Sequence, residues 1–206
     1  MSEIRVRPAT FRDRHTVVDT LVRAFDADPV VNFLLRQDRK RRWAFETFFD
    51  VAFRRLILPV QGAWLTEGGA ALWTPPGEWK SWRTWPDMFR LMRTFDGSRR
   101  RDVFAGSAQV QRAHPRAPHW YLYAMGVEPS RQGQGIGSAL LRAMLERCDT
   151  HGHAAYLEAS TESNARLYAR NGFRTTRDLD LSARGPSLRL MWREPISNHR
   201  KSYSHL

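Results

Sequence analysis

The sequence predicts a protein of the α/β (α+β) class, with a single domain built on a central sheet that helices flank. An aromatic, strand-like segment at 119–125 leads through a glycine-rich turn into a helix-like segment at 138–148. A second strand–helix pair follows at 154–160 and 164–172. At 206 residues the chain can bury a sizeable core without a second domain. We expect residues 1–194 to form that domain and the basic residues 195–206 to be a mobile tail.

The first part of the chain predicts an edge strand and two helices. Residues 4–8 alternate between apolar and basic side chains before a proline. Thr10 is a suitable N-cap for a helix whose apolar positions continue to Phe25, and the Asp28-Pro29 pair is expected to break it. A second helix is expected over 39–58, where large apolar residues recur at helical spacing.

The middle of the chain predicts a hairpin and then a helical insertion. Segments 63–66 and 69–75 are strand-like and meet at a glycine turn. Residues 76–118 begin with a Trp-rich stretch whose spacing predicts one or two helices with an aromatic face. That face could pack as core, cover an acceptor as a lid, or form a dimer contact, and we favour core that also walls the acceptor site. Its large members are Trp79, Trp82, Trp85, Met88, Phe89, Leu91, Met92 and Phe95.

The glycine-rich turn at 126–138 has the chemistry of a pyrophosphate site. Glycine permits positive φ and leaves no Cβ between a phosphate oxygen and the backbone amides. The first turn of the following helix adds unpaired N–H groups and the positive end of the helix dipole. Two other phosphate-binding motifs fit less well. A P-loop needs a lysine before Ser138, and a dinucleotide-binding fingerprint belongs to the first strand–helix unit rather than past mid-chain.

Two motifs in this region resemble those of the GCN5-related N-acetyltransferase (GNAT) superfamily. Residues 132–137 match the pattern Gln/Arg-x-x-Gly-x-Gly/Ala, and residues 164–173 resemble the superfamily's Asn-to-Tyr-x-x-x-Gly-Phe segment. The resemblance implies a GNAT domain with a mixed, mostly antiparallel sheet of about seven strands, splayed at a bulge before the pyrophosphate turn. The Leu157-Glu158 pair is similar to that of puromycin N-acetyltransferase-type small-molecule enzymes, a narrower likeness that covers mainly residues 119–173.

The resemblance also implies acetyl-CoA as the cosubstrate, with pantetheine lying between the splayed strands like an added strand. Backbone amides of Met125 and Val127 would face pantetheine and the thioester, and Gly126 is where a bulge would be cheapest. Asn164 is also expected to cap its helix. The predicted cosubstrate-binding residues are Met125, Gly126, Val127, Gln132, Gly133, Gln134, Gly135, Ile136, Gly137, Ser138, Asn164 and Tyr168.

Acetyl transfer to an amine needs a neutral amine as the nucleophile and stabilisation of the tetrahedral oxyanion. The departing CoA thiolate must be protonated or leave as the anion. By the resemblance, Tyr168 is the candidate acid for the CoA sulfur, and the competing interpretation is a packing tyrosine. Glu158 is the candidate base because it interrupts a buried strand, where a carboxylate can have a raised pKa. A structural carboxylate paired with an arginine, or a water chain in place of a base, remain alternatives. Tyr121, Tyr123 and His119 are weaker candidates.

The acceptor site is expected, again by resemblance, at the first two helices and the loop between them. Ordinary core packing is the competing interpretation for the aromatic candidates. The candidate acceptor contacts are Phe25, Asp26, Asp28, Trp43, Glu46, Phe49, Trp85 and Tyr121.

Composition narrows the partners and the location. A single cysteine, Cys148, rules out a disulfide framework, and the sequence contains no Cys, His and carboxylate cluster with metal-site spacing. No signal-peptide core or membrane-spanning stretch is present, so we expect a cytoplasmic monomer or homodimer without membrane contact. The net charge of +12 comes from arginines scattered along the chain, which favours attraction of anions such as CoA over nucleic-acid binding.

These observations together predict an acetyl-CoA-dependent N-acetyltransferase that acts on a primary amine of a small molecule by direct attack in a ternary complex. A peptide or protein amine is the second acceptor class. A non-catalytic acyl-CoA-binding sensor is the alternative from a different functional class.

Overall fold

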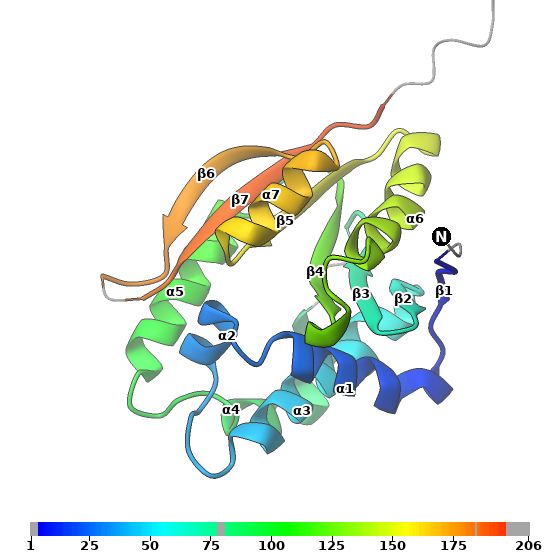
Figure 1. Cartoon of the computed structure of the whole chain (residues 1–206). Coiled ribbons are helices and arrows are strands. Elements are labelled where there is room, and N and C mark those ends of the chain that lie inside the picture. The colour runs from blue at the N-terminus through cyan, green and yellow to red at the C-terminus, as the bar shows by residue number, and fades with distance from the viewer. Residues whose placement is uncertain (1–3, 78–80, 184, 197–206) are drawn as a thin grey trace, which may run out of the picture.

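The computed structural model describes residues 4–77, 81–183 and 185–196, which fold as a seven-stranded mixed sheet with helices on both faces (Figure 1). The strand order is β1-β2-β3-β4-β5-β7-β6. Only β4 and β5 are parallel, and every other neighbouring pair is antiparallel, which confirms the predicted α+β class and the mixed, mostly antiparallel sheet. The strands are β1 (Arg7–Pro8), β2 (Ala63–Thr66), β3 (Gly69–Thr74), β4 (His119–Val127), β5 (Ala154–Ala159), β6 (Arg174–Asp180) and β7 (Ser187–Arg193).

Two helical layers cover the sheet. On one face α1 and α3 pack their apolar sides against β2, β3 and β4, and α5 covers β6 and β7. On the other face, α6 and α7 bury their apolar sides against β3, β4, β5 and β7. The α-helices are α1 (Arg14–Ala24), α2 (Pro29–Leu34), α3 (Arg41–Val51), α4 (Met88–Met92), α5 (Arg100–Ala113), α6 (Ile136–Thr150) and α7 (Glu162–Arg170). Shorter 3-10 helices are Phe11–Asp13, Leu58–Val60, Ser81–Asp87 and Pro129–Arg131.

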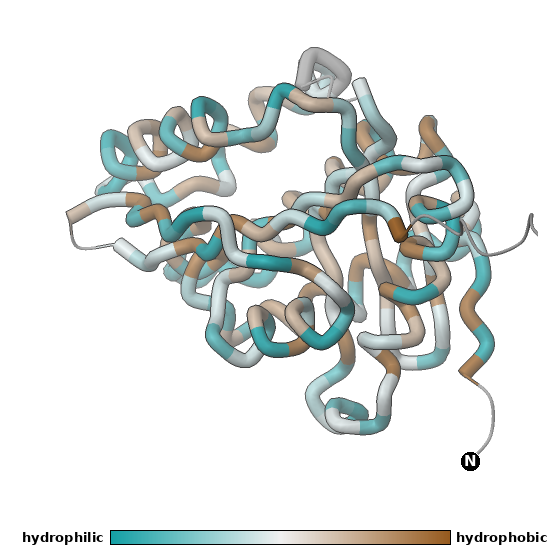
Figure 2. Tube along the Cα trace, turned by 90° about the horizontal axis from the view of Figure 1, so that it is seen from above, coloured by the Kyte–Doolittle hydropathy of each residue, from teal (hydrophilic) through white to brown (hydrophobic). Residues whose placement is uncertain are grey.

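The first elements follow the sequence pattern with small shifts. Residues 4–8 alternate between hydrophobic and hydrophilic colours next to the N-terminus in Figure 2, yet only Arg7–Pro8 pair with β2. Thr10 is the N-cap of the 3-10 turn before α1, and Asp13 is the N-cap of α1 itself. The predicted helix over 39–58 is confirmed, because α3 continues through a π-helical turn, Ala52–Ile57.

Two elements were not located from the sequence. The Asp28-Pro29 pair breaks the first helix as predicted, but it also begins α2: Asp28 Oδ1 accepts from the backbone N–H groups of Val30 and Val31, both at 2.9 Å. Proline at the first helical position costs nothing there because its missing N–H would be unpaired anyway. The other element is β6, an edge strand in which only Leu179 is buried, so its sequence lacks the alternation of a half-buried strand.

The sheet opens between β4 and β5. The two strands pair from His119 opposite Ala154 to Leu122 opposite Leu157, and no further. Beyond that point β4 follows β3 and β5 follows β7, so the strands diverge towards their carboxyl ends, as Figure 1 shows. The predicted splay is therefore present, and it leaves one edge of each strand without a strand partner.

The predicted bulge at Gly126 is wrong. The register of β3 and β4 shifts between Leu72 and Trp73, which makes Tyr123 the extra residue on β4. Gly126 itself is regularly paired, and the reason for glycine is packing. A Cβ built there would lie 2.6 Å from the Cβ of Ala24, so a side chain would push α1 away from β4.

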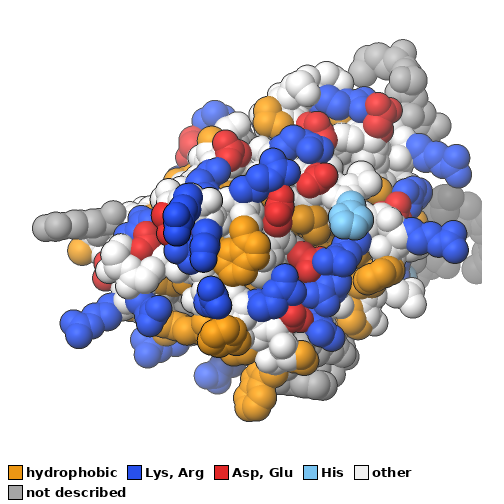
Figure 3. All heavy atoms as spheres, turned by 90° about the horizontal axis from the view of Figure 1, so that it is seen from below, with side chains coloured by type: hydrophobic (Ala, Val, Ile, Leu, Met, Phe, Trp, Pro, Cys, Tyr) orange, Lys and Arg blue, Asp and Glu red, His pale blue; other side chains and the backbone are white. Residues whose placement is uncertain are grey.

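The insertion is helical as predicted, but the expected aromatic core face is wrong. Trp85 is 75% exposed and Phe89 is 73% exposed. Figure 3 shows the face on the side of α3 and α4, where hydrophobic side chains stand among many Lys and Arg side chains. Phe95 is partly buried and bridges to Leu35. Trp79 and the expected tail from residue 197 lie outside the described residues.

Candidate active site

The glycine-rich turn between β4 and α6 has the backbone conformation that its sequence predicts. Gly133 and Gly135 have φ of 77° and 83°, a region that other residues rarely adopt. Gly135 is the N-cap of α6, and the N–H of Ala139 donates to its carbonyl oxygen at 3.0 Å. The amides of Ile136, Gly137 and Ser138 precede this bond, so they have no i−4 carbonyl within the helix. The turn thus presents amides and a helix dipole to an anion.

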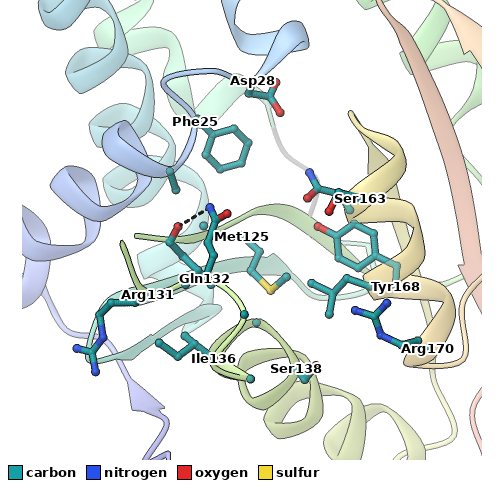
Figure 4. Close-up of a pocket in the computed structure, with 18 residues that line it drawn as sticks. Phe25, Asp28, Met125, Arg131, Gln132, Ile136, Ser138, Ser163, Tyr168 and Arg170 are labelled. Atoms are coloured by element: carbon teal, nitrogen blue, oxygen red, sulfur yellow. Dashed lines mark hydrogen bonds between the residues drawn. The ribbon is translucent and has the colours of Figure 1, made fainter. Parts of the chain in front are cut away.

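A cavity of about 420 Å³ joins this turn to the opening in the sheet (Figure 4). It brings together most of the predicted cosubstrate-binding residues with two of the predicted acceptor contacts. Predicted residues that line it are Phe25, Asp28, Met125, Gly126, Val127, Gln132, Gly133, Gly135, Ile136, Gly137, Ser138, Asn164 and Tyr168. Gln134, Glu158 and the predicted acceptor contacts Asp26, Trp43, Glu46, Phe49, Trp85 and Tyr121 do not line it.

A partly buried polar network ties the two sides of the opening together. The Ser160 hydroxyl at the end of β5 donates to Asp28 Oδ2 at the start of α2. The Asn164 amide group donates to Ser160 Oγ at 3.4 Å. The prediction that Asn164 caps α7 is wrong. Thr161 is the N-cap, and its hydroxyl oxygen accepts the N–H of Asn164 at 3.2 Å, because Thr161 lies three residues earlier in extended backbone.

Tyr168 extends from α7 into the cavity, with its ring among Phe25, Met125 and Ser163 in Figure 4. Its side chain is buried, and the ring packs at 6.0 Å from that of Phe173. Burial, reinforced by the negative charge of Asp28, raises the pKa of Tyr168 well above the ordinary value. The phenol therefore stays protonated through the physiological range and can donate a proton but not accept one.

Glu158 lies on β5 just past the last pair with β4, on the opposite face of the strand from Leu157. Its Oε2 accepts a hydrogen bond of 2.6 Å from the Tyr121 hydroxyl, and Oε1 lies 3.8 Å from His114 Nδ1. The side chain is 8% exposed, and Oε1 is buried with no hydrogen-bond partner among the described residues. Among the described residues, Glu158 has Tyr121 as its hydrogen-bond partner and His114 nearby, and no arginine pairs with it.

The predicted acceptor contacts other than Phe25 and Asp28 lie outside the cavity lining. Phe25 lines the cavity and packs against Phe49, with ring centroids 5.2 Å apart. Asp26 is exposed and pairs with Arg41 at 2.5 Å, and Glu46 pairs with Arg42 at 2.7 Å. Trp43 is partly buried on α3. The charges of Asp26 and Glu46 are therefore already compensated by arginines.

Five further residues line the cavity and were not predicted from the sequence: Ala24, Arg131, Ser163, Leu167 and Arg170. Arg131 precedes the glycines and pairs with Glu67 at 2.5 Å, so its guanidinium is turned away from the other labelled side chains in Figure 4. Ser163 and Arg170 sit on α7 on either side of Tyr168. Asn164, Leu167 and Arg170 are spaced three residues apart, so each neighbours the next on the surface of α7, and this spacing from Asn164 is the signal that could have found the last two.

Neither a metal centre nor a membrane helix is present in the described part of the chain. Its His, Cys, Asp and Glu side chains nowhere gather in a group of three or more that could hold a metal ion. Among the described helices, none combines the length and hydropathy that crossing a bilayer requires.

The family model and the two solved structures that follow are all described as acetyltransferases. The model of the Acetyltransferase (GNAT) family matches residues 59–173. A crystal structure described as histone acetyltransferase HPA2 and related acetyltransferase, from Corynebacterium glutamicum, is similar with a TM-score of 0.74 and 27% identity over 96% of this chain and 99% of that one. Polyamine N-acetyltransferase from Drosophila melanogaster shares the fold, with a TM-score of 0.66 and 18% identity over 93% and 100% of the two chains.

One curated relative is similar over a shorter stretch. The N-alpha-acetyltransferase RimI of Mycobacterium tuberculosis is 36% identical over 72 residues, which are 34% of this chain. The match spans 44% of the length of that relative.

Proposed function

Because the chain belongs to the acetyltransferase (GNAT) family, we propose that it transfers an acetyl group from acetyl-CoA to a primary amine of a small molecule, by direct attack in a ternary complex. The observation that carries this proposal is the continuous cavity from the glycine turn, through the opening between β4 and β5, to Tyr168 and Asp28. We also propose that residues 1–194 act as one acetyltransferase domain, since the sheet draws on strands from β1 to β7.

The residues of the turn fit a pyrophosphate. A Cβ at Gly133 would meet no atom within 4 Å, and at Gly135 only Ile4 at 3.9 Å, so both positions leave open space above the backbone. The amides of Ile136 to Ser138 are free of i−4 partners, and Arg170 lies at the cavity wall as a counter-charge. Past Leu122, β4 has no pairing with β5, and its backbone groups from Ala124 to Val127 are the ones we propose for an extended pantetheine arm.

Acetyl-CoA supplies the activated acetyl thioester when bound. Glu158 would remove a proton from the ammonium group of the acceptor, which leaves a nucleophilic amine. Its place just past the end of the β4–β5 pairing puts it beside the opening. Tyr168 would protonate the departing sulfur, a role that its neutral phenol and cavity-facing position support. Backbone N–H groups at Met125 and Val127 would orient the thioester oxygen and stabilise negative charge on it.

A small amine is favoured by the walls beyond Tyr168. Phe25 supplies an apolar surface and Asp28 a buried carboxylate, a combination that suits an amine with a short carbon body. The similar Drosophila structure is described as an enzyme that catalyses the formation of N-acetylagmatine. Puromycin N-acetyltransferase-type specificity is one form that this proposal can take.

A protein N-terminal amine is the second candidate. It is favoured by the 36% identity with N-alpha-acetyltransferase RimI, although that match covers only 72 residues. That stretch is 34% of this chain, so about two thirds of the chain lie outside the similarity.

The test is acetyl-CoA-dependent thiol release with the full chain, across aromatic antibiotic-like amines, polyamines, amino acids and N-terminal peptides. Release with one small-amine class supports the proposal, and release with peptides alone moves the assignment to a protein N-acetyltransferase. Acetyl-CoA binding by calorimetry runs beside it. Tight binding with no release from any amine would contradict the enzymatic proposal and favour an acyl-CoA-binding sensor.

A further inference from the structure

A second cavity, of about 660 Å³, lies between the segment that follows α2 and the segment that joins α4 to α5. Its lining comes from residues 36–38 and from positions between 89 and 100. None of these residues lines the cavity at the glycine turn, so the proposed acetyl transfer makes no use of them. On the α4 side the cavity belongs to the face in Figure 3 where hydrophobic side chains stand among Lys and Arg side chains.

The backbone around this cavity is fixed by pairing between its two walls. Leu35 and Phe95 form an antiparallel bridge, and the N–H of Arg36 donates to the carbonyl oxygen of Thr94 at 2.9 Å. Leu35 and Thr94 are fully buried at the base of this pairing. The two walls therefore hold their relative position without a ligand, as is usual for small-molecule sites.

Both carboxylates of the lining are already bound to other groups. Asp38 accepts from Arg36 with both oxygens: Nε donates to Oδ1 at 2.9 Å, and Nη2 donates to Oδ2. Asp96 Oδ2 accepts from Arg99 Nη2 at 2.7 Å, and its Oδ1 accepts from the hydroxyl of Ser98 at 2.6 Å. The charges of these two aspartates are thus compensated by Arg36 and Arg99.

Arg93 and Arg100 supply the remaining positive charge of the lining. The guanidinium carbon of Arg93 lies 5.5 Å from the ring centroid of Phe89. Arg100 Nη2 would lie 3.9 Å from a Cβ built on Gly97, so this guanidinium extends over a residue that has no side chain. Within the described part of the chain, no acidic side chain pairs with either arginine. Two exposed guanidinium groups therefore remain available to an anion.

An apolar wall stands beside these arginines. The ring of Phe89 is 73% exposed, and Met92 is half-buried on the same short helix. Phe95 contributes a ring that is partly packed into the core. Aromatic and thioether surfaces suit flat apolar groups.

From this combination we propose that the second cavity binds a small organic anion, with a carboxylate or phosphate group on a flat apolar body. The anionic group would bind Arg93 and Arg100, and the apolar body would lie against Phe89 and Met92. The volume is within the range of roughly 300–1,000 Å³ that small-molecule sites occupy. A second copy of this chain suits the cavity less well, because each copy carries a net charge of +12 and would bring the same basic face.

The test is calorimetric titration of the full chain with three probes that share one ring system: naphthoate, naphthyl phosphate and uncharged naphthamide. We expect each chain to bind one anion, and naphthamide to bind at least roughly tenfold more weakly. The tighter of the two anions identifies the acidic group that the site prefers. Absence of saturable binding by both anions up to about 5 mM overturns the proposal, and so does equal affinity for naphthamide.

Substitutions locate the bound probe. Arg93→Gln combined with Arg100→Gln should lower the affinity for the anions about tenfold or more. Arg112→Gln is the matched control, because Arg112 is also exposed and lies on α5 but not in the lining. Phe89→Ala should weaken both anions, whereas Phe104→Ala removes an exposed ring outside the cavity and should not. Wild-type affinity in the double arginine variant overturns the proposal, as does an equal loss in Arg112→Gln.

A competition experiment separates the two cavities. Acetyl-CoA should leave the affinity for naphthoate unchanged, because the two cavities share no lining residue. Displacement of the probe by acetyl-CoA would place it at the glycine turn and overturn the inference while supporting cosubstrate binding there. Failure of the chain to acetylate any amine would count against the proposed function alone, since the probe titrations need no turnover.

Discussion

Ser160 donates its hydroxyl hydrogen to Asp28, so the end of β5 is tied to the start of α2 across the mouth of the opened sheet. The same carboxylate accepts two backbone N–H groups of α2 with its other oxygen. One buried side chain thus caps a helix, connects the proposed acceptor side to the proposed cosubstrate side, and lines the cavity.

Asp28→Ala should lower the free energy of unfolding by about 1–3 kcal/mol, since it removes the cap of α2 and leaves the Ser160 hydroxyl without its acceptor. Asp28→Asn should cost less, because asparagine also caps helices well. Asp26→Ala is the matched control on the same loop: its carboxylate is exposed, and the pair with Arg41 is worth under about 1 kcal/mol. Urea unfolding of the three variants checks this, and equal losses in all of them would contradict the role of Asp28.

Gly126→Ala should destabilise the protein by about 1–3 kcal/mol through overpacking, because its Cβ would lie 2.6 Å from the Cβ of Ala24 and 3.2 Å from Leu21 Cδ2. Gly97→Ala is the control, since the nearest atom to its added Cβ is 3.9 Å away and its φ is not positive. Adding Ala24→Gly to Gly126→Ala should recover part of the loss, and thermal unfolding of the double-mutant cycle measures that coupling. Strictly additive effects would show that the two residues do not meet.

Gly135→Asp should weaken acetyl-CoA binding at least roughly tenfold, because it adds a negative side chain at the helix N-terminus where the phosphates are proposed to lie. Gly152→Asp provides the control. It has a similar positive φ of 66° and open space around its Cβ, but it follows the C-terminal end of α6. Calorimetry should show a lowered affinity for the first variant only. Equal affinities would rule out the turn as the phosphate site.

Tyr168→Phe should lower kcat by roughly 100-fold or more while leaving acetyl-CoA affinity nearly unchanged, because only the proton donor is lost. The raised pKa of Tyr168 fixes the sign of the pH effect: the phenol is protonated below its folded pKa, which lies above the ordinary value, so kcat should show no loss from this group up to pH 9. Phe173→Leu, which alters the ring packed against Tyr168, separates a packing effect from an acid effect. A kcat that survives Tyr168→Phe would remove this residue from the mechanism.

The sequence predicts most of the α6 side of this molecule because its signals there are local. The positive φ of Gly133 and Gly135, the helix that follows them, and the strand–helix unit carrying Tyr168 all depend on residues close in the chain. Most of the predicted cosubstrate-binding residues line the cavity there, and their binding of acetyl-CoA stays a prediction.

The acceptor side could be predicted only in part, because it depends on contacts between distant segments. Nothing near Asp28 indicates Ser160, which lies 132 positions later. Gly126 looked suited to a bulge, whereas the constraint comes from Ala24 on a helix packed against it. Trp85 has the spacing of a core residue but stands exposed, since spacing alone does not tell which surface, if any, covers a helix. The histidine pair at 114 and 119 depends on where α5 ends over β4 and β5.

The separation of β4 from β5 has a cost that a fully paired sheet avoids. It leaves two strand edges in the middle of the molecule, with backbone donors and acceptors that would ordinarily be filled by a neighbouring strand. A ligand lying along that edge binds the folded chain and not the unfolded one, so its concentration adds to stability by mass action. For this protein, therefore, the cellular level of acetyl-CoA would set not only how fast it works but also how long each copy survives heat and proteolysis.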